Sequence, residues 1–222
     1  SFPLSDLKDG EPLDLLGGRV AVQRTASHTR RLSMQRSDDD YPAITFDRKG
    51  TGYLLYQSFT PGLDRDERAK RWEAEPKDLS FLAKPAGGDH LWLHVRDGLH
   101  WTAQPLAVTE AGGDIYKSAL AAAGDGTLWI FWSQQQKGQF EILARSFAQG
   151  KLGPVQNLSQ SPGNDLAPVA TCDAQGRVWL AWQAANAEGR FEIRSMNQNS
   201  DGQWQAAQIL SHSQGNCWQP AI

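Results

Sequence analysis

Acidic and amide side chains recur at one position of a repeated sequence pattern, just before a short apolar segment. They are Asp38, Asp114, Asn164 and Asn216. Carboxylate and amide oxygens bind hard cations, and the same oxygens accept hydrogen bonds from sugar hydroxyl groups. Asp and Asn also cap turns by hydrogen bonding to the backbone two residues on. A position that repeats in every copy is usually structural, so turn capping is the favoured interpretation and ligand binding is the alternative.

Three consecutive carboxylates, Asp38, Asp39 and Asp40, form the densest of these groups and are the best candidates for ligand binding beyond turn capping. Calcium is the one cofactor that such oxygens suggest, and no other cofactor or metal is predicted. Glu141 and Glu192 occupy equivalent positions in the repeat, which favours a structural role over the paired carboxylates of a glycosidase. The motifs HExxH and GxSxG and the P-loop do not occur, so the enzyme classes that carry them lose support.

The composition excludes several kinds of partner. The chain of 222 residues has a formal net charge of −3 at pH 7, which indicates neither nucleic acid nor a membrane surface as its target. No apolar run is long enough to insert into a bilayer. Residues 1–18 are too polar for a signal peptide, and the chain does not begin with Met, so a processed or truncated start is expected. Cys172 and Cys217 are expected to be small buried side chains without a disulfide.

The polar residues above belong to a sequence repeat that must position them. Aromatic pairs mark its copies: Tyr53 and Tyr56, Trp129 and Trp132, Trp179 and Trp182. The repeated Asp and Asn positions show the same spacings, so the period is about fifty residues, and the first copy contains about 25 more. The last residues, NCWQPAI, begin a fourth copy and stop.

Each copy consists of four short apolar segments joined by turns that contain glycine, for example APVATC, VWLAWQ, FEIRSMN and WQAAQILS. Aromatic residues at i and i+3 of the second segment point to opposite faces of a strand, so both faces must be covered. Four-stranded antiparallel blades that stack on one another meet this requirement. The sequence therefore predicts an all-β protein with a β-propeller fold. A β-sandwich of unrelated hairpins would explain the alternation but not the shared spacing.

The repeat divides the chain into an N-terminal extension at residues 1–18 and a β-propeller at residues 19–222. It predicts a partial blade at 19–40, full blades at 41–113, 114–164 and 165–216, and the first strand of a further blade at 217–222. Three full blades with partial ones at both ends predict a fragment of a larger propeller.

A long insertion, residues 58–90, is predicted to lie between the second and third strands of the first full blade. Loops of this length tend to be functional or disordered, and this one is expected at the mouth of the central channel. Residues 64–75 contain helix-forming residues with opposite charges at i and i+4. On one interpretation they form a lid whose Trp72 stacks on a ligand or partner; on the other, Trp72 packs back onto the blade.

The units PAITFDRKGTGYLLY and PVATCDAQGRVWLAW resemble bacterial propeller repeats of the sialidase-like, BNR type. The sialidase Asp-box has the form SxDxGxxW, and the turns here differ from it in their Asp-to-Gly spacing, so no arginine triad is carried over. The segments GNDLAPVATCDAQGRVWLAWQ and GNCWQPAI are similar to propeller segments that precede a metal-dependent hydrolase domain of the PHP type in large exported bacterial proteins. This resemblance implies an accessory or substrate-presenting role, with the metal ligands outside this chain.

Blade packing occupies the regular positions, so only irregular loops remain to bind specifically. We therefore expect a non-catalytic module of a larger bacterial extracytoplasmic protein, periplasmic or secreted, that binds a saccharide or a protein partner at the channel mouth. Further domains of the same polypeptide are additional expected partners. One alternative is a sialidase-like glycosidase or lyase that uses Asp and Glu around the channel. The other is a purely architectural domain.

Overall fold

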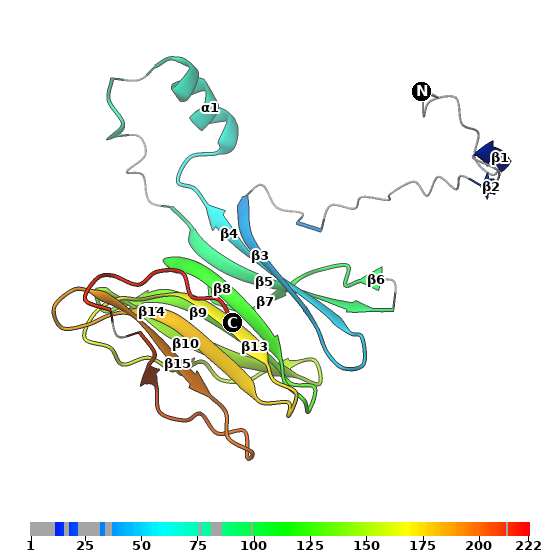
Figure 1. Ribbon diagram of the computed structural model, residues 1–222. Helices are drawn as coiled ribbons and strands as arrows, with labels where there is room; N and C mark the ends of the chain where they lie inside the picture. Colours follow the sequence, from blue (N-terminus) through cyan, green and yellow to red (C-terminus); the bar gives the residue numbers. More distant parts are fainter. Residues whose placement is uncertain are drawn as a thin grey trace. The chain divides into compact units, whose positions relative to one another are not determined.

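The computed structural model describes two units of the chain, Ser1–Gln35 and Arg36–Ile222 (Figure 1). The described residues are 12–15, 18–21, 32–33, 37–75, 77–80, 86–98, 100–211 and 213–222. In the first unit, β1 (Pro12–Leu15) and β2 (Gly18–Ala21) form an antiparallel hairpin. Much of the partial blade predicted at 19–40 lies outside the described residues.

The second unit contains three antiparallel sheets, each built from one copy of the repeat. The first blade contains β3 (Asp38–Phe46), β4 (Gly52–Thr60), β5 (Gly88–Asp97), β6 (His100–Trp101) and β7 (Leu106–Ala107). The second contains β8 (Ile115–Ala122), β9 (Leu128–Gln136), β10 (Gln139–Ala148), β11 (Lys151–Leu152) and β12 (Gln156–Asn157). The third contains β13 (Asp165–Cys172), β14 (Val178–Ala185), β15 (Phe191–Asn197) and β16 (Gln208–Ile209). Strands follow one another in chain order, so the predicted β-propeller fold is confirmed.

The fourth strand of each of the first two blades is split into two short pieces. In the second blade, β10 pairs with β11 through Phe147 and Leu152, and with β12 through Leu143 and Asn157. Pro154 lies between the two pieces and has no amide hydrogen to donate to the ladder. Because the fourth strand is the edge of the blade, this interruption leaves the inner strands fully paired.

The first strands lie next to one another, with β8 between β3 and β13, and each contains a β-bulge at the same place (Figure 1). The bulge residues Tyr41, Lys117 and Ala167 have positive φ angles of 48°, 60° and 53°. Residues with a Cβ seldom adopt this conformation, so its recurrence marks a built feature of the repeat. Gln219 has the same conformation, with φ of 50°, although residues 217–222 belong to none of the described strands.

The core consists of two apolar clusters, one on each side of the second blade. Tyr53 and Trp132 belong to the cluster between the first and second blades, and Phe131 and Trp182 to the cluster between the second and third. Trp129 packs against the second cluster. Trp129 and Trp132 therefore face opposite neighbours, as their i and i+3 spacing predicts. Each fully buried aromatic side chain stabilises the fold by about 1.5–3 kcal/mol.

The helix α1 (Arg65–Glu73) forms in the connection between β4 and β5, where the sequence predicts one. Figure 1 shows it at the tip of this connection, away from the sheets. Within the described part of the chain, no helix is long and apolar enough to cross a membrane.

The turns after β8 and β13 meet through glycine backbones. The amide of Gly124 donates to the carbonyl oxygen of Gly176 at 2.9 Å. A Cβ on Gly124 would lie 2.7 Å from the Cα of Gly176, which is closer than packed atoms tolerate. The second and third blades thus approach so closely here that only glycine fits.

We predict that Gly124→Ala lowers the free energy of unfolding by about 1–3 kcal/mol, because the new methyl group meets backbone that cannot rotate away. Gly215→Ala is the matched control, since its Cβ would have only the Ser213 Oγ at 3.8 Å nearby. Urea unfolding followed by tryptophan fluorescence measures both. Equal stabilities of the two variants would contradict a tight contact between the turns.

Candidate functional site

The repeated Asn side chains fix the beginning of the third strands. Asn164 Oδ1 accepts a hydrogen bond from the amide of Phe140 at 2.9 Å, and Asn216 Oδ1 accepts one from the amide of Phe191 at 2.8 Å. Each connection is thereby tied to the blade that precedes it, which is a structural task. Asp114, at the same position before the second blade, is exposed.

The three consecutive carboxylates bind three different groups. Asp38 forms an ion pair with Arg68 of α1 at 2.7 Å. Asp39 accepts a hydrogen bond from Ser37 Oγ at 2.9 Å, and Asp40 accepts one from the amide of the next residue at 2.7 Å. Among the described residues, no group of three acidic, histidine or cysteine side chains is arranged to hold a metal ion.

Contacts among its own residues stabilise the helix α1, and the indole of Trp72 on this helix is exposed. Asp64 caps the N-terminus by accepting from the amide of Glu67 at 2.9 Å, and Arg71 pairs with Glu67 at 2.9 Å. Trp72 is 61% exposed, and no residue of the helix is buried. Trp72 therefore does not pack back onto the blade, and the second interpretation given above does not describe the structure.

Two acidic side chains, Asp165 and Glu141, are buried between the second and third blades. Asp165 is fully buried, and its Oδ1 accepts from Trp182 Nε1 at 2.7 Å. Burial raises the pKa of the Asp165 carboxyl, and the negative charge of Glu141 adds to this rise. Glu141 is also buried and accepts from Ser159 Oγ at 2.7 Å. Asp165 was not among the candidate residues chosen from the sequence. The second blade has Ile115 at the equivalent position, and this change from an apolar to an acidic residue is visible in the sequence.

Aspartates in the turns between first and second strands hold the aromatic residue that follows. Asp173 Oδ2 accepts from Trp179 Nε1 at 2.9 Å, and Asp47 Oδ2 accepts from the hydroxyl of Tyr53 at 3.4 Å. These turn carboxylates therefore position the aromatic side chain that follows, although the turns differ from the sialidase Asp-box in their Asp-to-Gly spacing. The second blade has the same turn backbone but Ala123 at this position, so it lacks the carboxylate.

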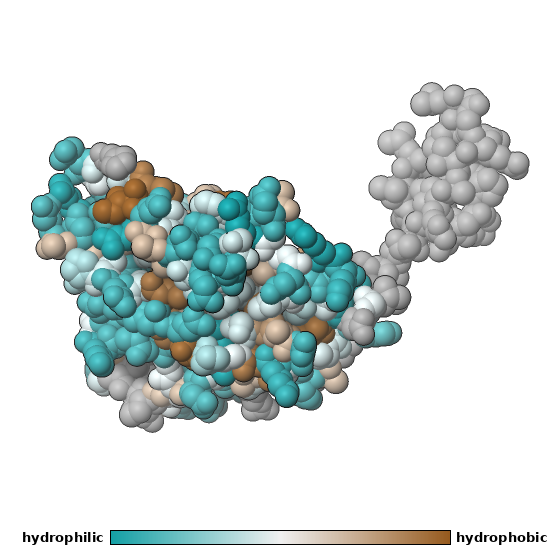
Figure 2. All heavy atoms as spheres, turned by 90° about the horizontal axis from the view of Figure 1, so that it is seen from below, coloured by the Kyte–Doolittle hydropathy of each residue, from teal (hydrophilic) through white to brown (hydrophobic). Residues whose placement is uncertain are grey.

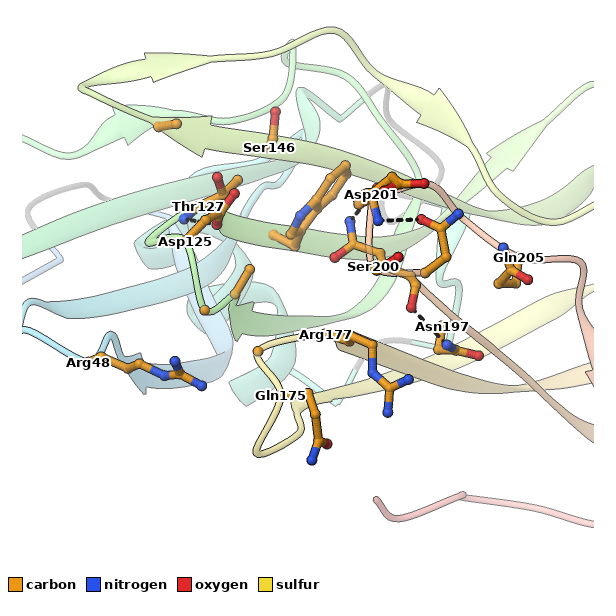
Figure 3. A pocket seen from close by; sticks show the side chains of 18 of the residues that line it. Arg48, Asp125, Thr127, Ser146, Gln175, Arg177, Asn197, Ser200, Asp201 and Gln205 are labelled. Carbon is orange, nitrogen blue, oxygen red and sulfur yellow. Dashed lines mark hydrogen bonds between the residues drawn. The ribbon is translucent and has the colours of Figure 1, made fainter.

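A groove of about 1120 Å³ lies between the second and third blades, at the end where these turns are (Figure 3). Asp125 and Thr127 line it from the β8–β9 turn, and Asp201 faces them from the segment between β15 and β16. Arg48 reaches it from the β3–β4 turn of the first blade, and Trp129 also lines it. Sequence reasoning did not find this groove, because its residues come from turns of three different blades.

Solved structures with a similar fold are propeller glycosidases. A Hadza microbial sialidase matches with a TM-score of 0.52 and 10% identity, over 77% of this chain and 37% of that one. The α-L-arabinanase of Penicillium chrysogenum, solved with arabinobiose, matches with a TM-score of 0.51 and 17% identity, over 81% of this chain and 52% of that one. This chain thus spans about a third to a half of those proteins. No protein-family model and no curated protein matches its sequence.

The turn carboxylate Asp173 predicts a specific pH dependence of stability. Its hydrogen bond from Trp179 and its pairing with Arg177 lower the pKa of Asp173 to about 2, from 3.8. A carboxyl whose pKa is lower in the folded chain stabilises the fold above pH 4, and this contribution is lost as the pH falls towards 2.

We therefore expect Asp173→Asn to be less stable than the unmodified chain at pH 6, with the difference shrinking between pH 4 and pH 2. Denaturant unfolding at a series of pH values measures it. Two stability curves that run parallel from pH 6 to pH 2 would show that the turn carboxylate contributes no such stabilisation.

Proposed function

We propose that this chain is a non-catalytic, saccharide-binding propeller module, with its site at the β4–β5 connection. The observation that carries this proposal is Trp72, whose indole is 61% exposed on a helix that Arg68 ties to Asp38 at 2.7 Å. An exposed indole stacks on the apolar face of a sugar ring, and a platform that is already held in place loses little freedom on binding. Asp39 and Asp40 lie on the strand that carries Asp38 and supply acceptors for sugar hydroxyl groups.

Three acidic side chains at the blade interfaces are not placed for hydrolysis. A glycosidase needs two accessible carboxyl groups about 5–10 Å apart across a pocket. Asp165 and Glu141 are buried, and Glu192 pairs with Arg194 at 2.7 Å. Each of these carboxyl groups takes part in holding the blades, so none is placed as an acid or base facing a substrate.

A saccharide is a better match than a protein partner. The face seen from below in Figure 2 is mostly hydrophilic, and its hydrophobic residues form small separate groups, so this face offers a protein partner no large continuous patch. The similar structures also process glycans. We further propose that the module serves other domains of a larger extracytoplasmic bacterial protein, such as a hydrolase domain of the PHP type.

We predict that Trp72→Ala weakens saccharide binding about tenfold, which corresponds to the loss of one stacking contact. Isothermal titration with arabinobiose and with sialyllactose measures the affinity. The matched control is Trp218→Ala, because Trp218 is 55% exposed but lies outside the β4–β5 connection. Thermal unfolding is expected to be unchanged in Trp72→Ala, since the indole it removes is not packed.

If Trp72→Ala and the unmodified chain bind each saccharide with equal affinity, the proposed site is contradicted. The alternative function, glycoside hydrolysis, has a separate test. Incubation of the protein with sialyllactose or arabinan, followed by chromatography of the products, is expected to show no released sugar. Release of sialic acid or arabinose would contradict the non-catalytic role.

A further inference from the structure

Two equivalent spaces between adjacent blades differ in size and in chemistry. The space between the first and second blades has a volume of about 420 Å³ and is lined by Tyr53, Val95 and Phe147. The ring of Phe147 packs edge-on against Tyr53, with centroids 6.3 Å apart, and forms part of its wall. The groove between the second and third blades has a volume of about 1120 Å³ and mostly polar walls.

Three differences from the smaller space accompany the larger groove. Ala123 replaces the turn aspartate of the other two blades, so no carboxylate occupies that position. Gln198 stands where the second blade has Phe147, since both residues pair with the first residue of a second strand. The turn after it, residues 199–202, is longer than the turn at Gly150. All three changes coincide at one place.

These departures leave Trp129 as a platform inside the groove. Its ring packs edge-on against Trp204, with centroids 5.1 Å apart at 81°, and lies near Phe131 at 6.3 Å. The counterpart Trp179 is held by a turn aspartate, and Trp129 is not, because that aspartate is Ala123. Trp129 is half-buried and backed by the apolar cluster, so its position is fixed while part of it lines the groove.

The polar groups around Trp129 can both donate and accept hydrogen bonds. Gln175, Gln205 and Gln208 are exposed amides, and Thr127 and Ser146 add hydroxyl groups. Sugar hydroxyl groups require partners of both kinds, which amides and hydroxyls supply. An aromatic platform with a few polar groups around it is the usual composition of a small-ligand site.

The charges that line the groove cancel. Arg48 and Arg177 are balanced by Asp125 and Asp201. Arg177 also pairs with the turn aspartate of its own blade at 2.8 Å, so the groove has no excess of positive charge. A groove without net charge gives no advantage to an anionic or cationic ligand.

We propose that this groove is a second binding site, and that its ligand is a neutral oligosaccharide. It is formed by the turns between first and second strands, whereas α1 lies in a connection between second and third strands, so the two sites are at opposite ends of the blades. The groove does not depend on Trp72, and the two proposals are tested by different variants.

The test restores the residues of the neighbouring blades. Gln198→Phe places at the wall of the groove the aromatic ring that Phe147 places at the wall of the smaller space, and Ala123→Asp returns the turn carboxylate. Neutral xylo-, cello- and arabino-oligosaccharides are titrated calorimetrically into the full chain and into each variant, and thermal unfolding confirms that the variants are folded. Saturable binding of a neutral probe is expected, weaker by about tenfold or more in each variant and unchanged in Trp72→Ala.

Failure of every neutral oligosaccharide to saturate the unmodified chain at millimolar concentration would overturn the proposal. Equal affinities in the unmodified chain and in a folded Gln198→Phe variant would overturn it as well. If Gln198→Phe does not fold, Ala123→Asp decides the question in the same way. Binding that Trp72→Ala removes and the groove variants keep would assign the ligand to the α1 site and reject the groove. Tighter binding of sialyllactose than of the neutral probes would contradict the ligand class.

Discussion

The structure depends on the packing of each second strand against two neighbours at once. In the second blade, Trp132 and Ile130 face the first blade and Phe131 faces the third, and all three are almost completely buried. A strand that is apolar on both faces cannot be exposed on either side, so every blade requires a neighbour on each side. Blades of similar size, joined by similar turns, meet this requirement, which accounts for the common period.

The same requirement separates structural side chains from those that are available for binding. Asn164 and Asn216, which recur in the repeat, are occupied by hydrogen bonds that position strands. Asp173 is occupied in the same way by the ring of Trp179. Some residues that break the repeat, such as Asp165, also have a structural task, whereas others, such as Trp72, lie at the surface. The helix α1 and the groove beside Trp129 are the two places where the departures gather, and each presents an aromatic side chain.

The sequence was sufficient to predict the fold because the signal is local and repeated. The i and i+3 aromatic pairs, the glycine turns and the fifty-residue period each indicate strands with two covered faces. The helix at 65–73 was also predictable from its charges and its composition. The split of the fourth strands was less visible, although Pro154 marks it in the second blade.

The site was harder to predict, because it depends on which residues meet across blades. Asp38 and Asp165 both lie in first strands, yet Asp38 is exposed and Asp165 is fully buried beside Trp182. They stand one position apart in the repeat, because Asn164 is the counterpart of Asp38, and adjacent residues of a strand face opposite sides. Phe147 and Gln198 occupy equivalent positions in the second and third blades, because each pairs with the first residue of a second strand. This equivalence, and therefore the difference between the two spaces, can be recognised only when the strand register is known.

We propose that ligands bind where the repeat is broken and not where it is kept. The most direct measurement is a ¹H–¹⁵N spectrum of the indole groups of the nine Trp residues during titration with a neutral oligosaccharide. We expect the signal of Trp129 to move with the ligand, while those of the buried Trp132 and Trp182 stay in place. The largest shifts at Trp132 or Trp182, or none at Trp129 when binding is saturated, would contradict the claim.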